Sequence, residues 1–169
     1  MASQNNKFYI TTSIAYTNAP PHIGFALELA QADVLARYHR ALGEDVFFLT
    51  GTDEHGRKVA QAAEKAGQTS EEFTDRISAL FRETVEKLGA SNNDFIRTTD
   101  KDRHWPVAKD IWLKLKENGD IYKKKYQGLY CLGCEAFITK KDLIEGNCYI
   151  HQKEPEVVEE ENYFFRLSK

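Results

Sequence analysis

The chain has 169 residues, a net charge of −3 and three cysteines. This length allows one substantial core. A pI near 6.0 gives no global signal for nucleic-acid binding, so any contact with RNA must be local or involve other sequence. No apolar run reaches the roughly 18 residues of a membrane span, and the polar N-terminus shows no secretory signal. These features favour a cytoplasmic protein.

The first part of the chain alternates strand and helix patterns. Residues 8–14 and 45–50 are apolar runs that predict buried strands, and residues 26–42 predict an amphipathic helix between them. The apolar positions of this helix are Leu27, Ala30, Val34, Leu35 and Tyr38. A strand, helix and strand in this order predict a right-handed crossover and a parallel sheet. The polar loops at 16–25 and 51–56 then meet at the carboxyl edge, where such sheets bind ligands.

Further elements are expected along the chain. Helices are predicted at about 58–65, 70–88 and 104–117, with Ser70 as the cap of the second, and a short strand at 94–99. From residue 121 the pattern changes to short β segments, which predicts a domain boundary near residue 120. The run Lys123–Lys125 either faces RNA or protects a solvated edge strand, and the second interpretation is favoured.

The cysteines form a metal-binding pattern. Cys131 and Cys134 make one knuckle, and Cys148 and His151 make another, with residues 135–147 between them. Three thiolates and an imidazole can close a tetrahedron around Zn²⁺, and a shell of four protein ligands leaves no position for a catalytic water. A structural zinc ion is therefore predicted. Two unrelated reduced turns, or a redox role for the first pair, are the disfavoured alternatives.

A second pattern stands at the entry to the first helix. His22 and Gly24 lie where backbone N–H groups and the helix dipole attract phosphate. Pro20 and Pro21 stiffen the approach, and glycine allows a ligand close to the backbone. Taken alone, the same residues could form a rigid strand-to-helix turn.

Three stretches together resemble the methionyl-tRNA synthetase family of class I synthetases. They are residues 16–24, 32–39 and 48–56, and the resemblance extends from Phe8 to the end of the chain. The family usually has histidine at the position of Phe25. The resemblance implies an α/β fold: a Rossmann-like parallel sheet, with residues 1–120 as the N-terminal half of a nucleotide-binding catalytic domain. Residues 121–169 would begin an inserted, β-rich zinc-binding domain.

The resemblance also implies roles for residues in two groups. The nucleotide-binding group is His22, which is also catalytic, with Gly24 and Phe25; the methionine-binding group is Ser13, Ile14, Tyr16 and Asp53. Asp53 would bind the α-ammonium group. Asp53 could instead cap the following helix, Ile14 could belong to the core, and His55 has no assigned role.

The implied reaction is the activation of methionine by ATP with Mg²⁺, followed by transfer to tRNA(Met). The second signature loop of the family, of the KMSKS type, is not found, since Met1 is the only methionine and residues 166–169 end a strand pattern. We therefore expect these 169 residues alone to be inactive, and most tRNA contacts to involve other sequence. The alternatives are a synthetase or nucleotidyltransferase for another substrate, and a non-catalytic zinc module that binds RNA or a protein partner.

Overall fold

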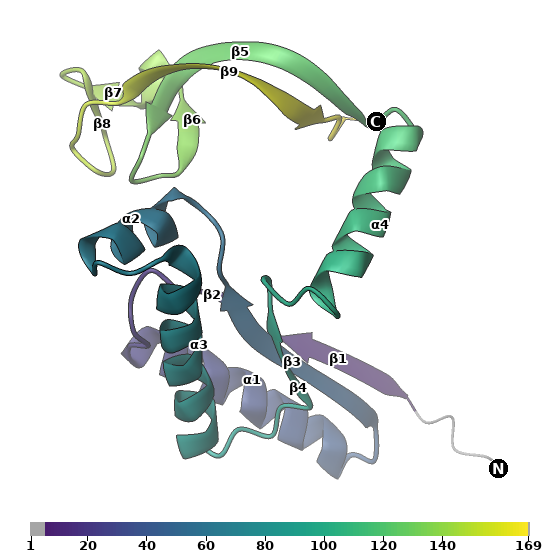
Figure 1. Ribbon diagram of the computed structural model, residues 1–169. Helices are drawn as coiled ribbons and strands as arrows, with labels where there is room; N and C mark the ends of the chain where they lie inside the picture. The colour runs from purple at the N-terminus through teal and green to yellow at the C-terminus, as the bar shows by residue number, and fades with distance from the viewer. Residues whose placement is uncertain (1–5, 169) are drawn as a thin grey trace. The chain divides into compact units, whose positions relative to one another are not determined.

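A computed structural model describes residues 6–168, which form two compact units (Figure 1). The first unit extends to Trp105 and the second begins at Pro106. The change between units falls inside helix α4 (His104–Glu117), whereas the functional boundary near residue 120 stays a prediction. No helix among the described residues is both long enough and apolar enough to cross a membrane.

The first unit is built on a parallel sheet. Its strands are β1 (Lys7–Thr11), β2 (Ala15–Tyr16), β3 (Asp45–Asp53) and β4 (Asp94–Arg97). The other three strands all pair with β3 in parallel, and β2 pairs with its carboxyl end. The predicted parallel α/β fold is thereby confirmed.

Helices α1 (Ile23–Ala41) and α3 (Ser70–Lys87) pack on one face of this sheet, and α2 (Arg57–Lys65) contacts α3 (Figure 1). Phe48 of β3 points into the core and is fully buried, whereas its neighbour Phe47 is 46% exposed. Phe47 stacks on Tyr9 of β1 on the opposite face. The strands therefore alternate between a covered face and an open one, because successive side chains of a strand point to opposite sides.

The face that α1 buries differs from the predicted one. The helix packs on the sheet through Phe25, Leu29, Ala32 and Ala36. The predicted apolar positions are all exposed: Leu27, Ala30, Val34, Leu35 and Tyr38. Two alanines on the buried face let the helix approach the sheet closely, which a face of larger side chains would prevent. The helix thus has two apolar faces, and the described residues cover one of them.

The N-terminus of α3 is capped by Thr69, so the prediction of Ser70 was wrong by one residue. The Thr69 hydroxyl accepts a hydrogen bond from the Glu72 N–H at 3.2 Å. In return, the Glu72 carboxylate accepts hydrogen bonds from the Thr69 N–H at 2.9 Å and hydroxyl at 2.8 Å. This reciprocal arrangement is a capping box, in which Ser70 already has helical geometry.

The second unit follows α4 with a β ribbon and a small knuckle. Its elements are β5 (Ile121–Cys131), β6 (Ala136–Ile138), η1 (Lys140–Asp142), β7 (Leu143–Ile144), β8 (Asn147–Cys148) and β9 (Glu156–Phe165). Strand β5 pairs antiparallel with β9 along most of its length and with β6 at its end. Strands β7 and β8 form a separate short hairpin.

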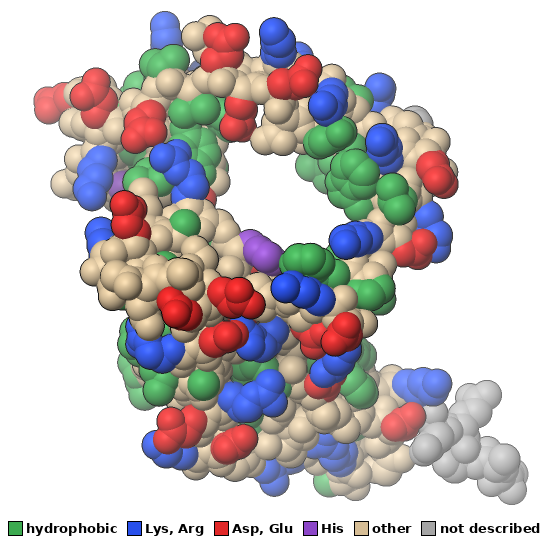
Figure 2. Space-filling model, in the orientation of Figure 1, with side chains coloured by type: hydrophobic (Ala, Val, Ile, Leu, Met, Phe, Trp, Pro, Cys, Tyr) green, Lys and Arg blue, Asp and Glu red, His purple; other side chains and the backbone are tan. Residues whose placement is uncertain are grey.

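The lysine run Lys123–Lys125 lies on β5 opposite an acidic stretch of β9. Lys125 is the register partner of Glu161, and the Lys123 ammonium lies 3.5 Å from the Glu161 carboxylate. Acidic and basic side chains are interspersed over the face of this ribbon seen in Figure 2. This mixture of charges favours the interpretation of a solvated strand over an RNA-binding patch.

Candidate active-site cleft and metal centre

A cleft of about 500 Å³ lies in the first unit, between the β1–β2 segment and the start of α1. It lies at the carboxyl edge of the parallel sheet, as the order of strands and loops predicts. All the predicted substrate residues except Asp53 line this cleft: Ser13, Ile14, Tyr16, His22, Gly24 and Phe25. Glu28 and Phe81 also line it and were not predicted.

His22 is the N-cap of α1. Its Nδ1 accepts a hydrogen bond from the Gly24 N–H at 3.0 Å, which satisfies one of the unpaired donors of the first turn. Because Nδ1 is the acceptor, a neutral imidazole carries its proton on Nε2. The capping role and a catalytic role are therefore compatible, since the cap selects the tautomer in which the other nitrogen is a donor.

Gly24 and Phe25 have clear packing roles. A Cβ atom at position 24 would lie 2.8 Å from Cε1 of His22, so glycine is needed for the imidazole to cap the helix. Phe25 is 5% exposed and packs edge-on against Phe81, with ring centroids 4.8 Å apart. The phenylalanine side chain has no hydrogen-bonding group, so a side-chain contact between Phe25 and a nucleotide would be through its ring.

Asp53 ends β3 beside the cleft. It is the register partner of Tyr16 on β2, and its carboxylate makes long contacts of 3.4 Å with the Thr98 hydroxyl and the His55 N–H. Helix α2 begins after Gly56 without a side-chain cap, so Asp53 does not have the alternative capping role. The His55 ring lies 3.3 Å from the Thr98 carbonyl oxygen and pairs with a backbone group.

Gly51, in the motif Thr50-Gly51-Thr52, is required for packing. A Cβ atom at this position would lie 2.0 Å from the carbonyl oxygen of Ile96 on β4. Thr50 and Thr52 are fully buried and point to the helix side of the sheet, where Thr50 contacts Thr12 at 2.8 Å. This part of the motif therefore shapes the sheet that presents Asp53.

Glu54 is an important residue that the sequence did not reveal. Its side chain is fully buried and accepts two hydrogen bonds from Arg97 of β4, at 2.7 and 2.9 Å. Thr52 and Thr99 donate to the same carboxylate. Burial alone would raise the pKa of Glu54, but these hydrogen bonds outweigh it and hold the pKa below its usual value.

Arg97 also contacts Asp75 of α3 at 2.5 Å. Its pKa is raised, first by the hydrogen bond to Glu54 and then by that to Asp75. One guanidinium thus joins the residue after β3 to β4 and α3. In the sequence, Glu54 is an acidic residue immediately after a buried strand, within residues 48–56, and nothing there indicates Arg97 as its partner.

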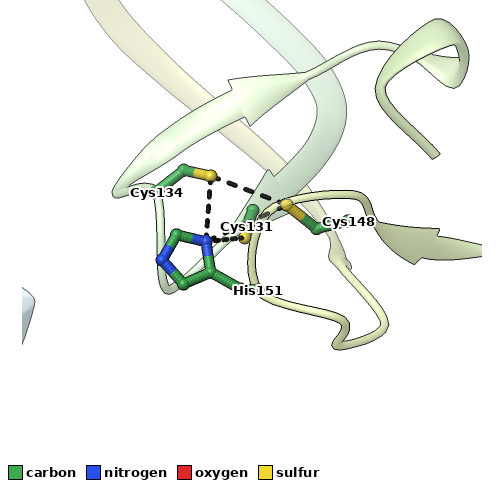
Figure 3. Close-up of side chains that lie close together, drawn as sticks. All are labelled: Cys131, Cys134, Cys148 and His151. Carbon is green, nitrogen blue, oxygen red and sulfur yellow. Dashed lines mark hydrogen bonds between the residues drawn. The ribbon is translucent and has the colours of Figure 1, made fainter. Parts of the chain in front are cut away.

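The predicted metal ligands come together in the second unit. Their ligand atoms all lie within 4.8 Å of one another, and they are Cys131, Cys134, Cys148 and His151. Figure 3 shows the three sulfur atoms and the His151 ring gathered at one point, with Nδ1 facing the sulfur atoms. The ligands come from the end of β5, the turn after it and the loop around β8.

The separations of these atoms suit a tetrahedral zinc site. The sulfur atoms of Cys134 and Cys148 are 3.6 Å apart, and Nδ1 of His151 lies 3.2–4.0 Å from the three sulfur atoms. Bond lengths of about 2.3 Å to sulfur and 2.0 Å to nitrogen place tetrahedral ligand atoms about 3.5–3.8 Å apart. Gly133 is needed here, since its Cβ would lie 2.4 Å from the His151 ring.

The thiols in this cluster have opposite pKa shifts. Hydrogen bonds from the His151 backbone N–H, and then from its side chain, lower the pKa of Cys148 to about 6 despite burial. Burial raises the pKa of Cys134 to about 12, and its hydrogen bonds with Cys131 and Cys148 add to this shift. The surroundings of Cys134 thus disfavour its thiolate, which a cation in the cluster would stabilise.

The first unit has a parallel sheet, a cleft at the carboxyl edge of that sheet and a helix N-terminus inside the cleft. This is the arrangement of a nucleotide-binding α/β domain. Residues 8–148 match the family model described as tRNA synthetases class I (M), and the chain belongs to this family.

The relatives make the family more specific. The chain is 50% identical to a methionine–tRNA ligase of Thermotoga maritima and 49% identical to one of Brucella suis, over 96% of the chain in both cases. A structure of the Mycobacterium tuberculosis methionyl-tRNA synthetase in complex with methionyl-adenylate is 42% identical, with a TM-score of 0.89 over 96% of the chain. The resemblance to methionyl-tRNA synthetases is confirmed.

The chain spans only part of these proteins. It covers 26% of the Thermotoga ligase, 32% of the Brucella ligase and 33% of the Mycobacterium chain. What the whole proteins bind and catalyse therefore depends on a larger structure than the described residues.

Proposed function

We propose that the full-length protein containing this chain activates methionine with ATP and transfers the methionyl group to tRNA(Met). The observation that carries this proposal is the cleft, which brings together a helix N-terminus, His22 and the β1–β2 segment at the carboxyl edge of the sheet. The relatives bear the name of this activity, and the Mycobacterium protein has methionyl-adenylate bound.

In the proposed reaction, a methionine carboxylate oxygen attacks the α-phosphorus of ATP, the bond to the bridging oxygen breaks, and pyrophosphate leaves. ATP enters with Mg²⁺. The N-terminus of α1 and the Nε2–H of His22 donate hydrogen bonds to phosphate oxygens as negative charge develops. Gly24 and Phe25 contact the nucleotide. The chemistry requires mainly positioning and charge stabilisation from the protein.

Methionine is proposed to lie against Ser13, Ile14 and Tyr16, with Asp53 binding its ammonium group. An aromatic ring suits a thioether, which favours Tyr16 as a wall of the pocket. A carboxylate at the end of a strand can accept a charge-assisted hydrogen bond from an ammonium group. Asp53 ends β3 beside Tyr16 and makes only long contacts with its neighbours, so it is available for this role.

The cluster of Cys131, Cys134, Cys148 and His151 is proposed to hold one structural Zn²⁺. The donor set and the atom separations support this assignment. The ion would stabilise the knuckle and take no part in the reaction. Most contacts with tRNA(Met) are assigned to the remainder of the full-length protein, and a cytoplasmic location stays a prediction.

The Asp53→Ala variant tests the methionine site. We expect it to raise the methionine KM by tenfold or more in the full-length protein, because a hydrogen bond between charged groups contributes about 1.5–3 kcal/mol. The measurement is methionine-dependent exchange of pyrophosphate into ATP. Asp45→Ala is the matched control, since Asp45 is an exposed aspartate at the other end of β3. An unchanged methionine KM in Asp53→Ala would contradict the assignment.

The same assay separates this function from a non-catalytic zinc module. A full-length protein that shows no methionine-dependent exchange, but binds RNA in a manner that depends on zinc and not on Asp53, would reject the proposed enzyme. Exchange that depends on another amino acid would instead redirect the proposal to a different synthetase.

A further inference from the structure

Glu28 makes an unassigned contact inside the cleft. It lies on α1 and accepts two hydrogen bonds from Ser13, one from the backbone N–H at 2.6 Å and one from the hydroxyl at 2.8 Å. The two residues are 15 positions apart in the sequence, and both line the cleft. The contact therefore joins the helix that carries His22 at its start to the segment between β1 and β2.

Ser13 lies where the edge of the sheet is interrupted. Strand β1 ends at Thr11 and β2 begins at Ala15; the backbone pairing with β3 extends to the Thr12 N–H and resumes in β2 at Ala15. The backbone N–H of Ser13 lies in this gap, and its partner is a side chain instead of a neighbouring strand, although Ser13 itself is exposed. The carboxylate of Glu28 supplies this partner and fixes the course of the backbone through Ser13 and Ile14.

We propose that Glu28 is a positioning residue for methionine, which it serves by holding the Ser13–Ile14 backbone in place. The inference rests on the proposed function, because Ser13, Ile14 and Tyr16 form the proposed methionine pocket. The carboxylate acts through Ser13 and need not touch the substrate. Two parallel hydrogen bonds to one carboxylate restrict both the backbone and the side chain of Ser13, so the pocket is shaped before methionine arrives.

Glu28→Gln and Ser13→Ala test this role in the full-length protein. Glutamine keeps the size of Glu28 but removes its charge and leaves one accepting oxygen, whereas Ser13→Ala removes only the hydroxyl bond. Glu72→Gln is the matched control, because Glu72 accepts the same pair of bonds from the N–H and hydroxyl of Thr69, outside the cleft. Thermal unfolding of each variant reports its effect on folding.

The readouts are the kinetic constants for methionine and ATP in pyrophosphate exchange. We expect Glu28→Gln to raise the methionine KM about tenfold, as for the loss of one charge-assisted hydrogen bond. The ATP KM and kcat should stay within about twofold, and the unfolding midpoint should fall no more than in Glu72→Gln. Ser13→Ala should raise the methionine KM about threefold, and the double variant should not exceed Glu28→Gln, since both changes break one unit.

Several results would overturn the inference. An unchanged methionine KM in Glu28→Gln would do so, as would equal increases for methionine and ATP. Additive effects in the double variant would mean that Glu28 contacts the substrate directly and does not act through Ser13. If Glu28→Gln lowers the unfolding midpoint far below that of Glu72→Gln, the test rests on Ser13→Ala alone. An unchanged methionine KM in Ser13→Ala then rejects the positioning role of Glu28. Wild-type protein without methionine-dependent exchange would reject the proposed function itself.

Discussion

Replacement of Cys134 by serine is expected to release the zinc ion and unfold the knuckle of residues 131–151. Among the described residues of the second unit, the only buried ones are Cys131 and Cys148, which are themselves proposed metal ligands. The knuckle therefore has no separate apolar core. In zinc-finger peptides the binding of a structural zinc ion contributes about 10–16 kcal/mol and is inseparable from folding. A site with the same kind of donor set should behave in the same way.

The measurement is zinc content after dialysis, together with the dispersion of the amide NMR signals of the knuckle. Wild-type protein should retain one ion per chain, and removal of zinc by a chelator should reproduce the spectrum of Cys134→Ser. Tyr149→Ser is the control, since Tyr149 lies between Cys148 and His151 in the sequence and is 55% exposed. Retention of zinc and of a native spectrum by Cys134→Ser would show that the cluster is not a structural metal site.

The first helix shows what the sequence could and could not predict about the fold. Apolar spacing correctly predicted a helix over most of α1, because periodicity depends only on the chain itself. The choice of buried face depends on what packs against the helix. Leu27 and Val34 belonged to the predicted face, but the buried face consists of Phe25, Leu29, Ala32 and Ala36. Because the helix has apolar residues on two faces, periodicity alone did not show which face the sheet covers.

In the site, too, the features set by local sequence were predictable and those set by distant partners were not. The metal ligands were predictable because each knuckle holds its two ligands three positions apart, so local geometry brings them together. His22 and Tyr16 were predictable because loops after parallel strands share one edge. Glu28 and Glu54 were not, since their partners lie 15 and 43 positions away. Only the folded chain shows that these carboxylates join segments that are distant in the sequence, Glu28 inside the cleft and Glu54 at the end of β3.

The Glu54→Gln variant is expected to lower the free energy of unfolding of the first unit by about 3–5 kcal/mol, because it removes one partner of a buried ion pair and leaves the other charge poorly compensated. Arg97 would keep its ion pair with Asp75, so the loss of unfolding free energy should lie toward the lower end of this range. Asp75→Asn is a matched control on the same guanidinium: Asp75 is 58% exposed, and an exposed pair contributes about 0–1 kcal/mol. Urea unfolding, followed by amide signals of the first unit, measures both variants.

The effect of Glu54 should also depend on pH. The pKa of its carboxyl group is lower in the folded chain than in the unfolded chain, where the pKa of a glutamate is about 4.3. Its stabilisation is therefore fully present above the unfolded pKa and is lost as the pH falls through the lower, folded pKa. The difference in unfolding free energy between wild type and Glu54→Gln should be largest near neutral pH and shrink in acid. A difference that stays constant, or that matches Asp75→Asn, would mean that burial of the Glu54–Arg97 pair does not stabilise the end of β3.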